Sequence, residues 1–356
     1  MSGSTTGTGG TLIVRFSRSF PPYVAPSTSV SGVMRGVLVA MIPGLAAQLW
    51  QFGPGVLVQL SIALVVAVAA EAAVLSMRRR AIVPVLRDNS AALSAALLAV
   101  SLPPLLPWWL TVFGTLFAIV VGKQLYGGLG YNPFNPAMVG YAVLLISFPK
   151  SMNHWLPPAD VAAYSLSWGD TISAIFDRSL PNGLTFDALA MATPLDTVKT
   201  RLALHESLDD IQAAGSFSRL AGKGWDWVNL GYLIGGLWLL RRRLISWQIP
   251  TAFLGTLFVS AMLFFLIDPA RYPTPLFHLL TGATMVGAFF IATDPVSAAT
   301  TPTGRLIYGG LIGFLIFVIR SFGGYPDGVA FAVLLMNLAA PALDYWTRPR
   351  VYGHSR

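Results

Sequence analysis

The chain has 356 residues, of which 54% are hydrophobic and only 11% are charged. Soluble domains carry about 25% charged residues, so this composition excludes an ordinary soluble protein and indicates a multi-span membrane protein. The net charge is +8, but the basic residues gather at the ends of apolar runs, as in the arginine runs at 78–80 and 241–243. This is a membrane-topology signal, so we expect membrane lipid as a partner and no nucleic acid. The chain has no cysteine, and therefore no disulfide and no usual ligand for an iron–sulfur cluster.

Apolar segments follow one another along the chain and predict an all-α membrane protein. Prolines 103, 104 and 107 end the third segment early, and a long polar interval separates the fifth segment from the sixth. A span needs roughly 20 apolar residues. We expect ten transmembrane helices, at about 33–50, 54–77, 89–101, 108–122, 137–148, 227–240, 249–267, 275–293, 306–319 and 328–343.

The basic loops give the orientation and divide the chain into five regions. With a cytoplasmic N-terminus, nearly all of the basic loops fall inside, as the positive-inside rule requires. We therefore expect both termini to be cytoplasmic and the polar interval to be extracytoplasmic. The expected regions are an N-terminal tail (1–30), a first membrane repeat (31–149), an outer loop (150–225), a second membrane repeat (226–347) and a C-terminal tail (348–356).

The two membrane halves share short stretches of sequence. The run YAVLL at 141–145 matches FAVLL at 331–335, and each follows a Gly-Gly pair and, further upstream, a basic residue, Lys123 or Arg320. A repeat with an odd number of spans inverts its second copy. Two inverted five-helix repeats with broken helices are the architecture of many transporters, and this is the fold that we predict.

The stretch from Ala192 to Thr197, in the polar interval, predicts the start of a helix. Thr193 suits the N-cap, Pro194 the first helical position and Asp196 the first turn. A helix N-terminus also offers free N–H groups and a positive dipole to a phosphate. The capping role of Thr193 is therefore compatible with attachment of a phosphorylated cofactor.

Several motifs together resemble one family. They are GGLGYNPFNP at 127–136, ATPL at 192–195, FFIATDPVS at 289–297, YPDGVAFAVLLMN at 325–337 and PRVYG at 349–353. The chain resembles the RnfD family, which supplies the D subunits of the Rnf ion-translocating ferredoxin:NAD oxidoreductase complexes. It is more remotely similar to the NqrB family, the B subunits of the sodium-pumping NADH:quinone oxidoreductases. The resemblance covers nearly the whole chain except the N-terminal tail.

The resemblance implies a covalent FMN joined through its phosphate to Thr193, although only the Ala-Thr core of the family's Ser-Gly-Ala-Thr signature is present. It also allows a second, non-covalent flavin such as riboflavin, for which the sequence offers no ligands. The implied function is electron transfer between ferredoxin- and NAD-linked centres, coupled to Na⁺ or H⁺ translocation in the bacterial inner membrane. The implied partners are the A, B, C, E and G subunits of the Rnf complex. We expect no catalytic side chain, and the scattered histidines show no metal spacing.

A competing attachment site is Thr284, because Thr281-Gly282-Ala283-Thr284 fits the signature better than the sequence at Thr193. This stretch lies inside the apolar run 272–293, so a modifying enzyme could not easily reach it. We expect its small residues to serve helix packing.

Charged residues near the spans are interpreted structurally. We expect Glu71 to extend towards the basic interface at 78–80, and Lys123, Arg320 and Asp327 to be ordinary solvated charges at span ends. For Asp294 two interpretations stay open, a cap or turn, and contact with a flavin or ion. Two alternative functions also stay open for the chain, an inverted-repeat transporter or channel without a redox centre and a scaffold subunit that has lost its flavin.

Overall fold

The computed structural model describes residues 29–213, 217–218 and 221–349. Most of both expected tails, and the closing motif beyond Pro349, lie outside the described residues. Within the described ranges the regular structure is helical, and pairing of extended backbone is limited to isolated bridges, Trp155 with Met191 and Phe217 with Gly222. This agrees with the predicted all-α class.

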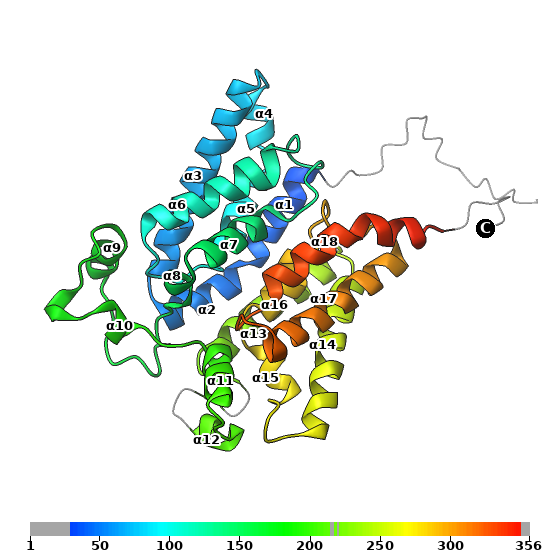
Figure 1. Ribbon diagram of the computed structural model, residues 1–356. Helices are drawn as coiled ribbons and strands as arrows, with labels where there is room; N and C mark the ends of the chain where they lie inside the picture. Colours follow the sequence, from blue (N-terminus) through cyan, green and yellow to red (C-terminus); the bar gives the residue numbers. More distant parts are fainter. Residues whose placement is uncertain (1–28, 214–216, 219–220, 350–356) are drawn as a thin grey trace, which may run out of the picture.

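The first half of the chain forms a helical layer followed by a polar segment of short helices. The first half comprises α1 (Val30–Ala40), α2 (Ile42–Phe52), α3 (Gly55–Met77), α4 (Ile82–Leu86), α5 (Ser90–Ala99), α6 (Trp108–Leu116), the π-helix η1 (Phe117–Gln124) and α7 (Pro136–Ser147). The polar segment comprises α8 (Pro149–Asn153), α9 (Trp168–Phe176), the 3₁₀ turn η2 (Pro181–Gly183), α10 (Phe186–Leu189), α11 (Pro194–Ala203) and α12 (Leu208–Ala213). Figure 1 shows α9–α12 together at the lower left, on the other side of the molecule from α4.

The second half comprises α13 (Trp225–Arg241), α14 (Gln248–Ile267), α15 (Pro275–Leu280), α16 (Thr284–Val286), the π-helix η3 (Gly287–Ile291), α17 (Pro302–Phe322) and α18 (Val329–Trp346). The two halves lie against each other through α2 on α13 and α7 on α18. This seam holds most of the buried apolar core and positions the cavities described below.

Helices occupy all ten segments that we predicted to span, but their lengths differ. In the described residues five helices are long and apolar enough to cross a membrane: Val30–Phe52, α3, α14, α17 and α18. The other segments hold shorter or interrupted helices, such as α5 with 10 residues and α7 with 12. α5 ends before the three prolines, and Gly282, at φ +59°, separates α15 from α16. The count of ten spans and their inverted arrangement therefore stay predictions.

The predicted position of Glu71 at the lipid–water boundary is wrong. Its side chain is fully buried, and its Oε1 accepts hydrogen bonds from Lys123 Nζ at 2.5 Å and from Gln124 Nε2 at 2.7 Å. Lys123, which we expected to be solvated, is 1% exposed and also donates to Ser90 Oγ at 2.6 Å. The π-helix η1 places Lys123 and Gln124 in consecutive positions facing α3 and α5. Pairing offsets part of the cost of burying both charges.

Candidate functional site

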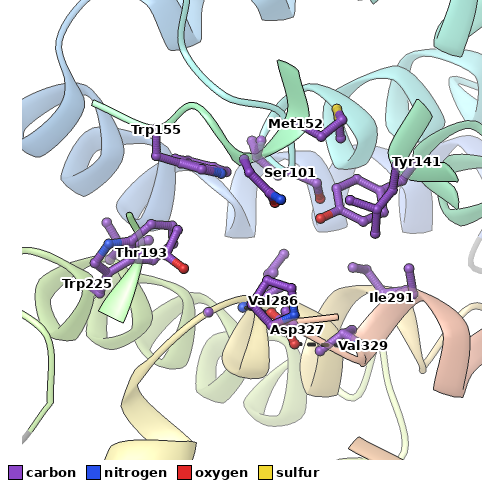
Figure 2. A pocket seen from close by; sticks show the side chains of 18 of the residues that line it. Ser101, Tyr141, Met152, Trp155, Thr193, Trp225, Val286, Ile291, Asp327 and Val329 are labelled. Atoms are coloured by element: carbon purple, nitrogen blue, oxygen red, sulfur yellow. Dashed lines mark hydrogen bonds between the residues drawn. The ribbon is translucent and has the colours of Figure 1, made fainter. Parts of the chain in front are cut away.

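A cavity of about 910 Å³, counting its open mouth, lies between the two halves of the molecule. Its walls come from α7 and α13, from the start of α16 and α18, and from the segment between α8 and α11 (Figure 2). Thr193 lies at its edge. We call this space the Thr193 cavity.

Aromatic side chains form one wall of the Thr193 cavity. Trp155 and Trp225 meet edge to face with ring centroids 5.0 Å apart, and Phe52 packs on Trp225 at 5.1 Å. The Met191 N–H donates to the carbonyl of Trp155 at 2.8 Å, which ties the segment before Thr193 to this wall. Tyr141 of α7 lies on the other side of the cavity from Trp155 (Figure 2). An aromatic, partly polar pocket of this kind suits a flat, conjugated ligand.

Thr193 is the N-cap of α11, as its sequence predicted. Its backbone is extended, at φ −62° and ψ 156°, and its Oγ1 accepts a hydrogen bond from the Asp196 N–H at 3.3 Å. Pro194 occupies the first turn and is buried. The Thr193 side chain is half-buried, and its hydroxyl donates to no described residue. A phosphate attached to this oxygen would lie at the positive end of the helix dipole and beside the N–H of Leu195, because Pro194 has no N–H and the Asp196 N–H already bonds Thr193.

α11 is fixed to the second half of the molecule by Lys199. Its Nζ donates to the carbonyl of Tyr325 at 2.7 Å and to that of Ile319 at 3.2 Å, near the end of α17. Burial lowers the pKa of Lys199, and the neighbouring Asp196 carboxylate opposes this shift. Burial likewise raises the pKa of Asp196, opposed by Lys199. These contacts hold the Thr193 end of the helix at the cavity edge.

A network around Arg320 lies behind the part of the cavity lined by Gly282, Ala283 and Asp327, so the predicted solvation of Arg320 and Asp327 is wrong. Asp327 accepts from Arg320 Nη2 at 3.0 Å and from the Ala283 N–H at 2.8 Å. Arg320 Nη1 donates to the His278 carbonyl at 2.7 Å. Gly282 lies within this network, where a Cβ would come 2.5 Å from Asp327 Oδ2. The network closes the break between α15 and α16 and presents Asp327 to the cavity.

Thr284 is buried and its hydroxyl is fully engaged. Its Oγ1 donates to the carbonyl oxygens of His278 at 2.8 Å or Thr281 at 2.9 Å, and it accepts from Arg320 Nη2 at 2.9 Å. The side chain is inaccessible to solvent. Thr284, which matches the attachment signature better than Thr193, therefore serves packing inside the protein, as its apolar setting predicted.

A second cavity, of about 700 Å³, opens between α1, α5 and the turn before α7 in one half and η3 in the other. Lys123, Asn132, Asn135 and Asp294 belong to its polar lining. Asn135 caps α7 and also donates to the Ile291 carbonyl at 3.3 Å, so the glycine-rich turn packs on the interrupted helix. Asp294 accepts from Ser297 Oγ at 2.8 Å, which fits its interpretation as a turn residue. Among the described residues no group of three His, Asp or Glu could hold a metal ion.

Sequence reasoning missed the aromatic wall. Trp155 and Trp225 lie 70 positions apart at the two ends of the polar interval, and no local pattern links them. Tyr141 stood in the repeated YAVLL run, whose repetition indicated symmetry but not a cavity.

The fold and the two cavities define a polytopic helical protein with a cavity between its two halves and a capping threonine at the edge of that cavity. The sequence profile of the NQR2, RnfD, RnfE family matches residues 17–353, and the chain belongs to this family. It is 53% identical over 343 residues to the D subunit of the ion-translocating oxidoreductase complex of Escherichia fergusonii, covering 94% of this chain and 97% of that protein. The proteins of the same name from Shigella dysenteriae serotype 1 and Escherichia coli K12 are each 54% identical, with the same coverage. The resemblance inferred from the motifs is confirmed.

Proposed function

We propose that the chain is the membrane flavoprotein subunit of an Rnf-type ion-translocating oxidoreductase complex. In this proposal it passes electrons between ferredoxin- and NAD-linked centres on partner subunits, coupled to Na⁺ or H⁺ translocation. The close relatives are each named as the D subunit of an ion-translocating oxidoreductase complex, and they match this chain over nearly its full length. The A, B, C, E and G subunits of the Rnf complex are the proposed partners, and the bacterial inner membrane is the proposed location.

The observation that carries the proposal is the position of Thr193. Its half-buried hydroxyl lies at a helix N-terminus and at the edge of a cavity of about 910 Å³, counting the open mouth, with an aromatic wall. Thr193 would hold an FMN through its phosphate, and the positive end of the α11 dipole, with the N–H of Leu195, would stabilise the phosphate charge. The bound flavin supplies one- and two-electron redox chemistry. Trp155 and Trp225 would exclude water from the ring, while Tyr141 and Asp327 offer it polar contacts.

The second cavity is the proposed position of the non-covalent flavin. It has a similar size and lies on the same seam. The starts of α16 and α18, in the second half, line the Thr193 cavity, and the starts of α5 and α7, their proposed equivalents in the first half, line the second cavity. Two spaces related in this way suit two cofactors in one electron path.

The inverted ten-span arrangement is part of the proposal. α3 packs on α5, α6 and η1, and α14 packs in a comparable way on α15, η3 and α17. The pairs that cross the seam, α2 with α13 and α7 with α18, would be equivalent segments of the two halves. With the basic loops inside, both termini are cytoplasmic and residues 150–225 are periplasmic.

The test is in-gel flavin fluorescence of the denatured protein, produced in a host that has the flavin-attaching enzyme. We expect fluorescence to stay with the wild-type band and to be lost from Thr193→Val. Thr284→Val is the matched control, because it removes the same hydroxyl from a buried position, and it should keep the fluorescence of whatever protein is made. Fluorescence that survives in Thr193→Val contradicts the assignment of the site.

The alternative function is an inverted-repeat transporter or channel without a redox centre. The observation that favours it is the pair of cavities on the seam, beside interrupted helices. A wild-type band without bound flavin from a flavinylating host would favour this alternative, or a scaffold subunit, over the flavoprotein.

A further inference from the structure

α9 carries an unusual outward face for a helix outside the spans. Trp168, Ile172 and Phe176 follow one another at intervals of four residues and are 56%, 46% and 45% exposed. This spacing aligns them in one stripe along the helix. The flanking positions on the same side are Gly169 and Ser173, so this face bears no charge. A helix surrounded by water normally places charged residues on its outward face.

The neighbouring face of α9, about 110° around the helix from the stripe, packs against the beginning of a membrane span. Ala174 and Ile175 are fully buried, in a cluster with Leu105 and with Val58 and Ile62 of α3. α3 begins at Gly55 and has 23 residues, which makes it about 34 Å long at 1.5 Å per residue. A helix of this length just exceeds the roughly 30 Å of the hydrocarbon core.

The depth of these contacts places α9 beside the bilayer and not above it. Val58 and Ile62 lie about 5 and 10 Å along α3 from its first residue, at 1.5 Å per residue. A helix that packs on both is level with the boundary between headgroups and acyl chains, where in-plane helices bury their apolar face by about 5–10 Å.

The stripe is also continuous with the aromatic end of a second predicted span. Phe176 stacks on Trp108, the first residue of α6, with ring centroids 6.3 Å apart. Trp108 and the adjacent Trp109 are 41% and 46% exposed. Tryptophans at span ends gather at the interface of membranes. The stripe therefore extends a surface that already has the composition of a lipid contact.

We propose that α9 is an in-plane membrane helix of the outer leaflet and that the stripe Trp168–Ile172–Phe176 contacts acyl chains. In this arrangement α9 anchors the segment that leads to Thr193 at a fixed depth. The proposal concerns lipid and does not depend on the presence of a flavin.

The absence of cysteine makes the chain suitable for a spin-label test. Ile172→Cys is labelled with a nitroxide in the complete complex in lipid nanodiscs, and collisions with oxygen and with a water-soluble nickel chelate are measured. The complex with the cysteine-free chain gives the background from partner subunits. A label at Val65→Cys, a position in α3 that is 70% exposed, gives the reference value for acyl chains. A label at Asp209→Cys, which is exposed on α12, gives the reference value for water.

We expect the label at Ile172 to have a higher oxygen-to-nickel collision ratio than the label at Asp209, approaching that at Val65. Trp168→Cys should give the same result and protects the test against failure of one variant. A ratio equal to that at Asp209 means that the stripe faces water, and this overturns the proposal. Low collision rates with both reagents mean that a partner protein covers the stripe, which overturns it as well.

Discussion

At the scale of single residues, the buried charged side chains are paired with groups of opposite charge. Lys123 and Glu71 are 1% and 0% exposed, and Arg320 is buried against the less buried Asp327. The two cations occupy corresponding places in the repeated sequence, before a Gly-Gly pair. In the first half, Lys123 connects the π-helix η1 to α3 and α5. In the second half, Arg320 connects α17 to α15, next to the break before α16. Removing one partner would leave an uncompensated charge in a medium of low dielectric constant.

We predict that Lys123→Met lowers the free energy of unfolding by about 3–5 kcal/mol, because the buried Glu71 loses its cationic partner. The double variant with Glu71→Gln should recover much of this loss. The measurement is denaturant-induced unfolding in detergent micelles. Arg201→Met is the control: the pair of Arg201 with Glu206 is about one-third exposed, so its loss should change stability little. The prediction fails if Lys123→Met is no more destabilising than Arg201→Met.

At the scale of elements, glycines decide how closely the two halves approach. α2 and α13 cross with their backbones in contact, and a Cβ on Gly231 would lie 2.9 Å from Gly44 Cα. A Cβ on Gly235 would lie 1.9 Å from the Ala40 carbonyl oxygen. Small residues that permit such approach are typical of helix contacts in membranes. A larger residue at Gly231 or Gly235 must push the two halves apart, and this would also separate the walls of both cavities.

We therefore predict that Gly235→Ala destabilises the protein by about 1–3 kcal/mol, the usual cost of overpacking. Gly255→Ala in α14 is the matched control, since a Cβ there meets nothing within 4 Å. It should stabilise the helix by up to about 1 kcal/mol through helix propensity. Thermal unfolding of both variants in micelles gives the comparison. Equal effects of the two substitutions would exclude a close contact at Gly235.

At the scale of the whole molecule, two cavities lie on one seam between halves that resemble each other in packing. In the proposed inverted arrangement, one cavity lies towards each side of the membrane. The polar segment with α11 and α12 then belongs to the outer side, and the loops rich in arginine belong to the inner side.

The orientation predicts which positions a membrane-impermeant maleimide can reach in intact cells stripped of their outer membrane. Asp209→Cys on α12 should react at once, whereas Arg242→Cys at the end of α13 should react only after the inner membrane is permeabilised. Both residues are exposed in the fold, so a difference in labelling reports the membrane side and not burial. The opposite labelling pattern would contradict the proposed orientation.

The sequence by itself determined the features that depend on local chemistry. Apolar runs predicted helical segments at the observed places, Thr193-Pro194 predicted the start of α11, and the motifs predicted the family. Each of these signals lies within a few neighbouring residues, since caps, prolines and apolar stretches act on the backbone next to them.

The tertiary structure decided what depends on contacts between distant segments. It buried Glu71 against a lysine 52 positions away, joined Trp155 to Trp225, and enclosed Thr284 while leaving Thr193 at a cavity. A charge near a span end looks the same in sequence whether it is solvated or paired inside. The difference arises only when close packing brings its partner within hydrogen-bond distance, because burial is then less costly than it would be for the isolated charge.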